Sequence, residues 1–311
     1  MVRVQSPSAL PAYTTALGSL YGGTIEEILS SPIAASLRGK VQLIFTSPPF
    51  PLNTKKRYGN LQGEEYLSWL AGLAPALRKL LRADGSIVLE IGNAWEAGSP
   101  TMSTLPLRAL LSFAEAADLR VCQQFIAHNP ARLPSPVQWV NVERIRLKDT
   151  FAHIWWMSPT DRPKADNRKV LTPYSARMAA LLRNGTYNSG KRPSEHVIGE
   201  SSFLTDNGGA IPGNVITVSN TGSAGDYLRY CREHGLTPHP ARMPSQIAEF
   251  FIRLLTDAGD LVVDPFAGSN TTGAAAESLA RRWLSVEPSD EYIEGSKGRF
   301  TSTQVASAPP R

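Results

Sequence analysis

Cysteine is scarce in this 311-residue chain, which contains only Cys122 and Cys231. The two thiols do not show the paired spacing that marks a disulfide framework or a zinc site. We also see no clustered ligands for another metal, so the sequence predicts no metal site. The cysteines are expected to be free thiols in a reducing compartment.

Long apolar runs are missing as well. Arg, Asp or Pro interrupts the most apolar stretches, so none reaches the length of a membrane span. The first residues, MVRVQSPSALPAY, lack the apolar region of a secretory signal. These absences predict a soluble protein of the cytoplasm.

Charge is sparse and unevenly distributed. The net charge is +5, but residues 129–195 carry twelve Lys or Arg against five Asp or Glu, a net +7 that leaves −2 for the rest. A basic middle on a near-neutral scaffold favours a polyanion such as duplex DNA as partner. A solvated loop region rich in arginine would explain the same numbers.

Strand and helix patterns alternate along the chain. Apolar runs predict buried strands at 41–46, 86–91, 151–157, 260–263 and 282–286. Helical spacing predicts helices at 64–81, 107–117, 245–255 and 271–280. Asp84 and Gly85 predict a turn before the second strand. This alternation predicts an α/β fold with a doubly wound, parallel, Rossmann-like sheet.

The chain divides into three blocks and a tail. Residues 1–158 and 238–300 carry the strand and helix patterns and are expected to form the two parts of one catalytic domain. Residues 159–237 are rich in Arg, Lys, Gly, Asn, Ser and Pro with little periodicity, which is typical of an insertion with a binding task. Residues 301–311 (TSTQVASAPPR) are expected to be a flexible tail.

One chemistry-bearing motif is the segment 261–273, LVVDPFAGSNTTG. A buried strand leads into a tight turn, where Gly268 lets the backbone approach a ligand closely. The free amides of the following helix favour an anion, and Asp264 could bind an amino group. Glu287, at the end of the next strand, could accept both hydroxyls of a ribose. A dinucleotide phosphate loop would need GxGxxG, which is absent.

The second motif is Ser47-Pro48-Pro49-Phe50, directly after the strand 41–46. The two prolines stiffen the chain and remove two amide donors, which leaves carbonyl oxygens free to accept. A planar amine placed there could donate to the Ser47 hydroxyl and the Pro48 carbonyl while its ring stacks on Phe50. Such a pocket would favour an exocyclic amino group as the attacking atom. Ser-Pro-Pro alone is also common in simple turns.

Together the two motifs resemble those of the amino-methyltransferases of DNA. The order, with SPPF before DPFAGSNTTG, is similar to the permuted β class. The segments YTTALGSLYGG, YGNLQGEEYLSWL, LPSPVQWVN, KVLTPYS and HPARMP closely resemble the PvuII-type cytosine-N4 methyltransferases of restriction–modification systems. The resemblance covers most of residues 13–300. It implies S-adenosylmethionine as cofactor, S-adenosylhomocysteine as product, duplex DNA as partner and, by extension, a cognate restriction endonuclease.

The resemblance also assigns roles to matching positions. The flipped base would be held by Ser47, Pro48, Pro49 and Phe50. The cofactor would be held by Asp264, Phe266, Gly268, Ser269, Asn270, Thr271, Thr272 and Glu287, with His239 and Arg242 at its methionine end and Thr15 in a stretch that closes over it. For His239, a helix-entry residue without a ligand is the simpler interpretation.

Further residues are candidates on chemical grounds. Glu90, where the nearest relatives have a shorter Asp, could bind the ring edge of cytosine or relay the lost proton, or be a buried acid satisfied by amides. Arg144, Arg146 and Lys148 alternate on an expected extended segment and share one face, which suits phosphate contacts or a solvated edge. Lys191 and Arg192 stand in a Ser- and Gly-rich stretch that we expect to read a groove.

Three alternatives were weighed, of which two remain open. An adenine-N6 methyltransferase would use the same geometry, although it usually has Asp or Asn where Ser47 stands. A catalytically inactive DNA-binding protein would keep the fold, but the intact motifs argue against it. A cytosine-C5 methyltransferase needs a nucleophilic cysteine, usually after proline. Cys122 follows Val and Cys231 follows Tyr, so we exclude that class.

Overall fold

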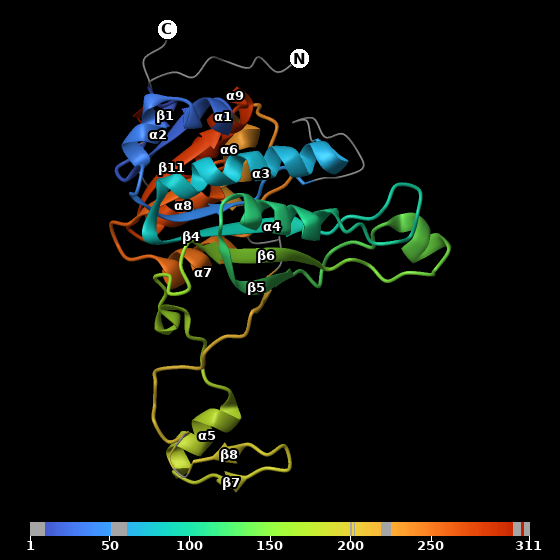
Figure 1. The fold of residues 1–311 in the computed structure, drawn as a ribbon, viewed down its shortest axis with the longest axis vertical. Helices are drawn as coiled ribbons and strands as arrows, with labels where there is room; N and C mark the ends of the chain where they lie inside the picture. Colours follow the sequence, from blue (N-terminus) through green and yellow to red (C-terminus); the bar gives the residue numbers. More distant parts are fainter. Residues whose placement is uncertain are drawn as a thin grey trace. The chain divides into compact units, whose positions relative to one another are not determined.

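The computed structural model describes residues 10–50, 61–199, 201, 203–218, 225–300 and 306–307. They form two compact units. The larger is drawn from residues 1–165 and 214–311, and the smaller from residues 166–213. The larger unit contains the central sheet and both motifs (Figure 1).

Within the described residues, ten strands form this sheet in the order β12-β1-β2-β11-β10-β3-β4-β6-β5-β9. Neighbours from β2 to β4 are parallel, whereas β1 and β6 run in the opposite direction. The bounds are β1 (Tyr13–Thr14), β2 (Gly18–Gly22), β3 (Val41–Thr46), β4 (Leu81–Gly92), β5 (Arg120–His128), β6 (Phe151–Ser158), β9 (Val215–Thr217), β10 (Leu261–Asp264), β11 (Arg282–Glu287) and β12 (Ala306–Ser307).

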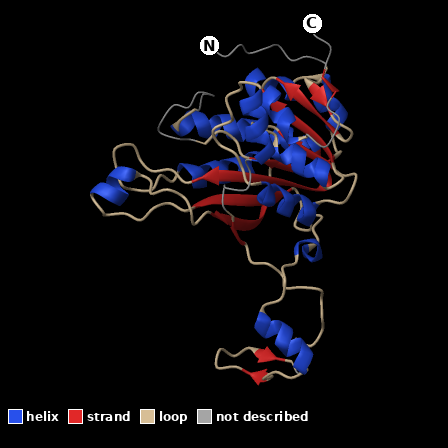
Figure 2. Cartoon of the chain, turned by 180° about the vertical axis from the view of Figure 1, so that it is seen from behind, coloured by secondary structure: helices blue, strands red, loops and turns tan. Residues whose placement is uncertain are grey.

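Helices cover both faces of the sheet, as the view from behind also shows (Figure 2). Ile44 of β3 belongs to a core that it shares with residues of α1 to α4. The next residue, Phe45, points to the other face and stacks on Phe251 of α7, with ring centroids 5.5 Å apart. The helices are α1 (Ile25–Leu29), α2 (Pro32–Leu37), α3 (Gly63–Leu80), α4 (Leu105–Ala116), α6 (Gly225–Glu233), α7 (Ser245–Leu255), α8 (Thr271–Ser278) and α9 (Asp290–Ser296), with short η1 (Gln138–Val142) and η4 (Lys297–Arg299).

The predicted doubly wound, mostly parallel sheet is confirmed, with three corrections. β5 had no predicted counterpart, and β6 runs antiparallel because no crossover helix separates it from β5. The predicted turn at Asp84 and Gly85 is wrong: both residues lie inside β4, where the register with β3 shifts. A Cβ at Gly85 would lie 2.9 Å from the Val41 carbonyl oxygen, so this irregularity requires glycine. The predicted extended segment at 144–148 is a loop in which Arg144 has φ +58°.

The smaller unit contains η2 (Asn167–Val170), α5 (Ala176–Asn184) and the two-stranded sheet of β7 (Gly190–Lys191) and β8 (Val197–Ile198). It begins at 166 and ends at 213, whereas the insertion expected from sequence spans 159–237. β9 and α6, which fall inside the expected insertion, belong to the larger unit. Of the predicted tail 301–311, all but 306–307 lies outside the described residues.

Asn270 connects the sheet, α8 and the N-terminal strands. It is fully buried, has a left-handed backbone with φ 54°, and caps α8 by accepting from the Gly273 amide at 3.2 Å. The same Oδ1 accepts from the Ser285 hydroxyl at 2.7 Å, while its amide nitrogen donates to the Tyr13 hydroxyl at 2.9 Å. The predicted cofactor residue Asn270 is therefore occupied by contacts within the fold.

We expect Asn270→Ala to lower the free energy of unfolding by about 2–4 kcal/mol. Three buried hydrogen bonds lose a partner, and alanine must adopt a positive φ. Urea unfolding measures the change. Asn270→Gly keeps the backbone favourable and should lose less. Equal stability of wild type and Asn270→Ala would contradict this account.

Candidate active site

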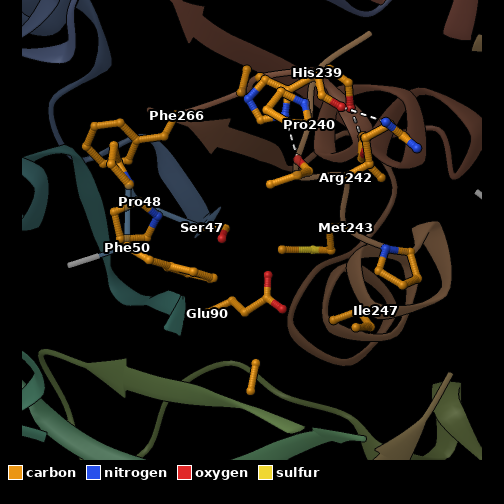
Figure 3. A pocket seen from close by; sticks show the side chains of 18 of the residues that line it. Ser47, Pro48, Phe50, Glu90, His239, Pro240, Arg242, Met243, Ile247 and Phe266 are labelled. Carbon is orange, nitrogen blue, oxygen red and sulfur yellow. Dashed lines mark hydrogen bonds between the residues drawn. The ribbon is translucent and has the colours of Figure 1, made fainter. Parts of the chain in front are cut away.

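A cavity of about 360 Å³ lies at the carboxyl ends of the parallel strands. Both motifs line it, one from the end of β3 and the other from the turn after β10 (Figure 3). The segment 239–244 before α7 forms another side, and residues at the β5–β6 connection complete the rim. The structure thus brings together segments that are far apart in the sequence.

The two motifs are joined by one buried hydrogen bond. The Thr46 hydroxyl, at the end of β3, donates to Oδ1 of Asp264, at the end of β10, over 2.6 Å. Asp264 also accepts from the Phe266 amide at 3.1 Å and is hydrogen-bonded to the Thr272 side chain. Burial raises the pKa of Asp264, and these hydrogen bonds oppose the rise.

The predicted direct roles of Asp264 and Thr272 toward the cofactor stay predictions. Neither residue is among those that line the cavity, and the Asp264 carboxylate accepts hydrogen bonds from the chain's own donors. Their observed part is to shape the turn that follows β10.

Glu287 and Gly268 form the floor on the β11 side. Glu287 accepts from the Gly268 amide at 2.8 Å and from the Ser289 amide at 3.0 Å. Burial raises the pKa of Glu287 to about 7, despite these two amides. Gly268 has φ +52°, and a Cβ there would come 3.0 Å from the His239 ring, so a glycine is needed at this close approach.

The segment 239–244 presents His239 and Arg242. His239 Nδ1 lies 2.5 Å from the Ala241 carbonyl oxygen, and burial lowers the pKa of His239, which favours the neutral ring. Arg242 donates to the His239 carbonyl at 2.6 Å. Its Nε is buried and has no hydrogen-bond partner among the described residues. Arg242 also lines the cavity, where its positive charge would attract an anion.

On the opposite wall, Ser47 meets Glu90 of β4 (Figure 3). Burial raises the pKa of Glu90 to about 7, opposed by its hydrogen bond with Ser47 and by the charge of Arg132. A carboxylate can only accept, so the Ser47 hydroxyl donates to the ionised Glu90 and keeps its lone pairs free to accept. Phe50 lies beside them, and its ring would lie 2.8 Å from a Cβ at Gly92, so Gly92 leaves space for it.

Most predicted site residues line the cavity. They are Ser47, Pro48, Pro49, Phe50, Glu90, His239, Arg242, Phe266, Gly268, Ser269, Thr271 and Glu287. Asn270 does not, and neither does Thr15, whose hydroxyl donates to Glu277 at 2.6 Å. That contact gives Thr15 a partner within the fold, and its place at the cofactor stays a prediction.

The predicted DNA-binding residues are dispersed. Arg146 donates to the Pro100 carbonyl and to Asp149, and Lys148 donates to two backbone carbonyls, so these two hold the loop that carries them. Arg144 is exposed on that loop. In the smaller unit, Lys191 forms an exposed ion pair with Glu195 at 3.4 Å, and Arg192 donates to the Asn188 carbonyl.

Sequence reasoning missed several residues of the site. Asn129, Arg132 and Thr150 line the cavity from the β5–β6 connection, and Met243 and Tyr292 add apolar surface. Arg299 was also missed. It donates to the Ser269 carbonyl and hydroxyl, and burial lowers its pKa to about 10. Recognition of strand β5 would have placed Asn129, Arg132 and Thr150 at the cavity.

Comparison with known proteins identifies the family. A family model described as DNA methylase matches residues 41–298. The chain belongs to this DNA methylase family. A relative, the type II methyltransferase M.PvuII of Proteus hauseri, is 44% identical over 298 residues, which cover 95% of this chain and 87% of that protein.

Solved structures agree with this family. The PvuII DNA methyltransferase, described as cytosine-N4-specific, superposes with a TM-score of 0.74 at 38% identity, covering 96% of this DNA methylase and 90% of that chain. A complex of M1.HpyAVI with SAM has a TM-score of 0.54 at 19% identity, covering 92% and 100%, and shares the fold. Among the described residues, no group of three or more His, Cys, Asp or Glu could hold a metal ion. No helix in the described part of the chain is long and apolar enough to span a membrane.

Glu90 should make the stability of the DNA methylase depend on pH. Its pKa is about 7 in the folded protein against an ordinary value of 4.5, so the folded state binds this proton more tightly. The resulting stabilisation is present below pH 4.5 and is lost as the pH rises through 7. We compare the unfolding free energy of Glu90→Gln with that of wild type at each pH. The difference should shift in favour of Glu90→Gln by about 2 kcal/mol when the pH is raised from 5 to 8.

Urea unfolding of both proteins at the two pH values tests this. Glu65→Gln replaces an exposed glutamate of α3 and serves as the matched control. A Glu90→Gln difference that is the same at both pH values would show that burial does not hold the proton.

Proposed function

We propose that this DNA methylase transfers a methyl group from S-adenosylmethionine to N4 of cytosine in duplex DNA. The observation that supports it most is that Ser47 and Glu90 share one cavity with Gly268 and Glu287. The residues that would bind the amine and those that would bind the cofactor therefore line the same space. The identity of 44% to M.PvuII, and the cytosine-N4 specificity named for its structural counterpart, favour cytosine.

The residues present fit S-adenosylmethionine. Each Glu287 oxygen already accepts one amide and has a further lone pair, which suits ribose hydroxyls. Arg242 lines the cavity and its guanidinium charge suits a carboxylate, and Thr271 lines it at the start of α8, where a helix N-terminus favours an anion. Phe266 and Tyr292 provide flat apolar walls for the adenine ring. When bound, the cofactor supplies a methyl group on a sulfonium sulfur.

The chain's own residues prepare the amino group. The Ser47 oxygen, oriented by its donation to Glu90, accepts one hydrogen of the amine, and a carbonyl of the Pro48–Pro49 corner accepts the other. The two acceptors draw the nitrogen out of conjugation with its ring, so its lone pair becomes available. Phe50 stacks on the base and aligns it. Glu90, as a carboxylate, takes the proton that the methylated nitrogen releases.

The cytosine must leave the helix to enter this cavity, because its amino group is paired within the duplex. We assign phosphate contacts to Arg144 and groove reading to the smaller unit, with Lys191 and Arg192 on its hairpin. Arg146 and Lys148 support the loop that carries Arg144. A restriction endonuclease that cuts the same DNA site would be the functional partner of an enzyme of this type, at the nucleoid.

Product analysis tests the function. Unmethylated phage DNA is incubated with methyl-labelled S-adenosylmethionine, digested to nucleosides and analysed by mass spectrometry. We expect N4-methylcytosine. N6-methyladenine would instead assign the enzyme to adenine, and no labelled nucleoside would overturn the proposal. Sequencing of the modified DNA then gives the recognition site.

Two variants should distinguish residues that act on the amine from residues that bind the cofactor. Ser47→Ala is expected to lower kcat by about 100-fold with an unchanged Kd for S-adenosylmethionine, because it removes an acceptor that acts on the amine. Glu287→Gln is expected to raise that Kd by about tenfold through weaker ribose contacts. Calorimetry and single-turnover kinetics measure both. Equal loss of cofactor binding in the two variants contradicts the assignment.

The pH–rate profile should report Glu90. Its pKa of about 7 predicts that the single-turnover rate rises with pH through 7, as the carboxylate that takes the proton forms. Arg132 lowers this pKa, so Arg132→Ala should move the midpoint to higher pH. Glu90→Gln should abolish this rise of the rate with pH. A profile that keeps its midpoint in Glu90→Gln would assign the titration to another group.

A further inference from the structure

Residues 129–150, here called the rim arm, connect β5 to β6 beside the cavity. The rim arm leaves the sheet after His128 and returns at Phe151, and η1 lies at its far part (Figure 1). Asn129, Arg132 and Thr150, near its two ends, line the cavity. A substrate that enters the cavity therefore passes the base of the rim arm.

The rim arm exposes large apolar side chains. Isolated exposed leucines are ordinary, but here five large apolar residues stand within a short segment. The exposed fractions are Leu133 81%, Val137 59%, Val142 64%, Ile145 62% and Leu147 87%. The segment also carries three arginines and one lysine against one Glu and one Asp. Apolar side chains on a basic segment suit a partner with a polyanionic backbone and an apolar interior, as a base-paired duplex has.

Leu133 differs from the others because the turn that presents it is fixed. The Arg132 amide donates to the Asn129 carbonyl at 3.2 Å, and the Arg132 guanidinium donates to the Phe151 carbonyl at 3.2 Å. Lys148 donates to the carbonyls of Pro130 and Arg132 at 3.1 and 3.0 Å. Leu133 follows directly. The backbone of this turn is already ordered, so insertion of the Leu133 side chain, one residue from the cavity lining, need not order the backbone as well.

We propose that Leu133 inserts into the duplex at the position that the target cytosine vacates. The inference rests on the proposed function, because it requires a base that leaves the helix. Removing a base from the stack breaks its stacking and leaves a gap between its neighbours. A leucine side chain in that gap contacts the flanking bases and loses its exposure to water. It therefore stabilises the open duplex while the cytosine is held at Ser47.

The experiment compares paired and unpaired targets. Leu133→Ala is assayed in single turnover on two duplexes that carry the site read from the wild-type product. In one the target cytosine pairs with guanine, and in the other it faces an abasic position. We expect kcat/KM of Leu133→Ala to fall about tenfold or more on the paired duplex and to stay within about threefold of wild type on the abasic one, where opening costs less.

Controls separate insertion from general damage. Leu133→Met keeps a large apolar side chain and should restore activity on the paired duplex. Leu111→Ala removes a leucine of α4 that is 57% exposed and does not line the cavity, and it should leave the activity on both duplexes unchanged. A duplex with 2-aminopurine at the target should fluoresce more with wild type than with Leu133→Ala, since the unstacked base is held open less often.

The outcomes are distinguishable. If Leu133→Ala loses activity equally on both duplexes, or on neither, insertion is wrong. If it changes the mass of the protein in sedimentation without DNA and acts alike on both duplexes, the rim arm is instead an interface between two copies. If wild type gives no methylated cytosine from which a site can be read, the proposed function fails and not this inference alone.

Discussion

The hydrogen bond between Thr46 and Asp264 is the constraint on which the site depends. It joins residues 218 positions apart and ties the ends of β3 and β10 at the point where each strand gives way to its motif. Both partners are buried, so no bulk water replaces a lost partner. Breaking the bond would therefore leave unsatisfied polar groups. The prolines after β3 and the glycine turn after β10 then start from fixed positions. The positions of the two motifs at the cavity therefore depend on the joined ends of β3 and β10.

Sequence patterns were sufficient for the parts of the fold with strong local signals. The apolar runs that end in Ser-Pro-Pro and Asp-Pro-Phe mark β3 and β10, since buried strands followed by breaking residues have few other interpretations. The amphipathic spacing of 245–255 gave α7 with its observed bounds. β5 escaped because most of its side chains are only partly buried, so its apolar periodicity is weak.

The roles of individual polar residues were harder to predict, because they depend on where distant partners lie. The sequence shows an acid at the end of β10 but not that the Asp264 carboxylate turns to Thr46. It shows Thr15 but not that the Thr15 hydroxyl donates to Glu277. Arg146 and Lys148 have the charge expected of phosphate contacts, yet nearby carbonyls and Asp149 engage them. Residue type predicted the chemistry, and long-range packing decided which atoms remain available for it.

The way the smaller unit is connected has a consequence for how such enzymes diversify. The chain leaves the larger unit after β6 and rejoins it at β9, and both strands pair with β5 at one border of the sheet. The strands that bear the cavity motifs, β3, β10 and β11, lie away from that border. Natural variation can therefore lengthen, shorten or replace the inserted segment without disturbing the hydrogen bonds that hold the reacting groups. If the smaller unit reads the DNA groove, as we propose, the preferred DNA sequence can change in one part of the gene while the residues of the cavity are retained in the other.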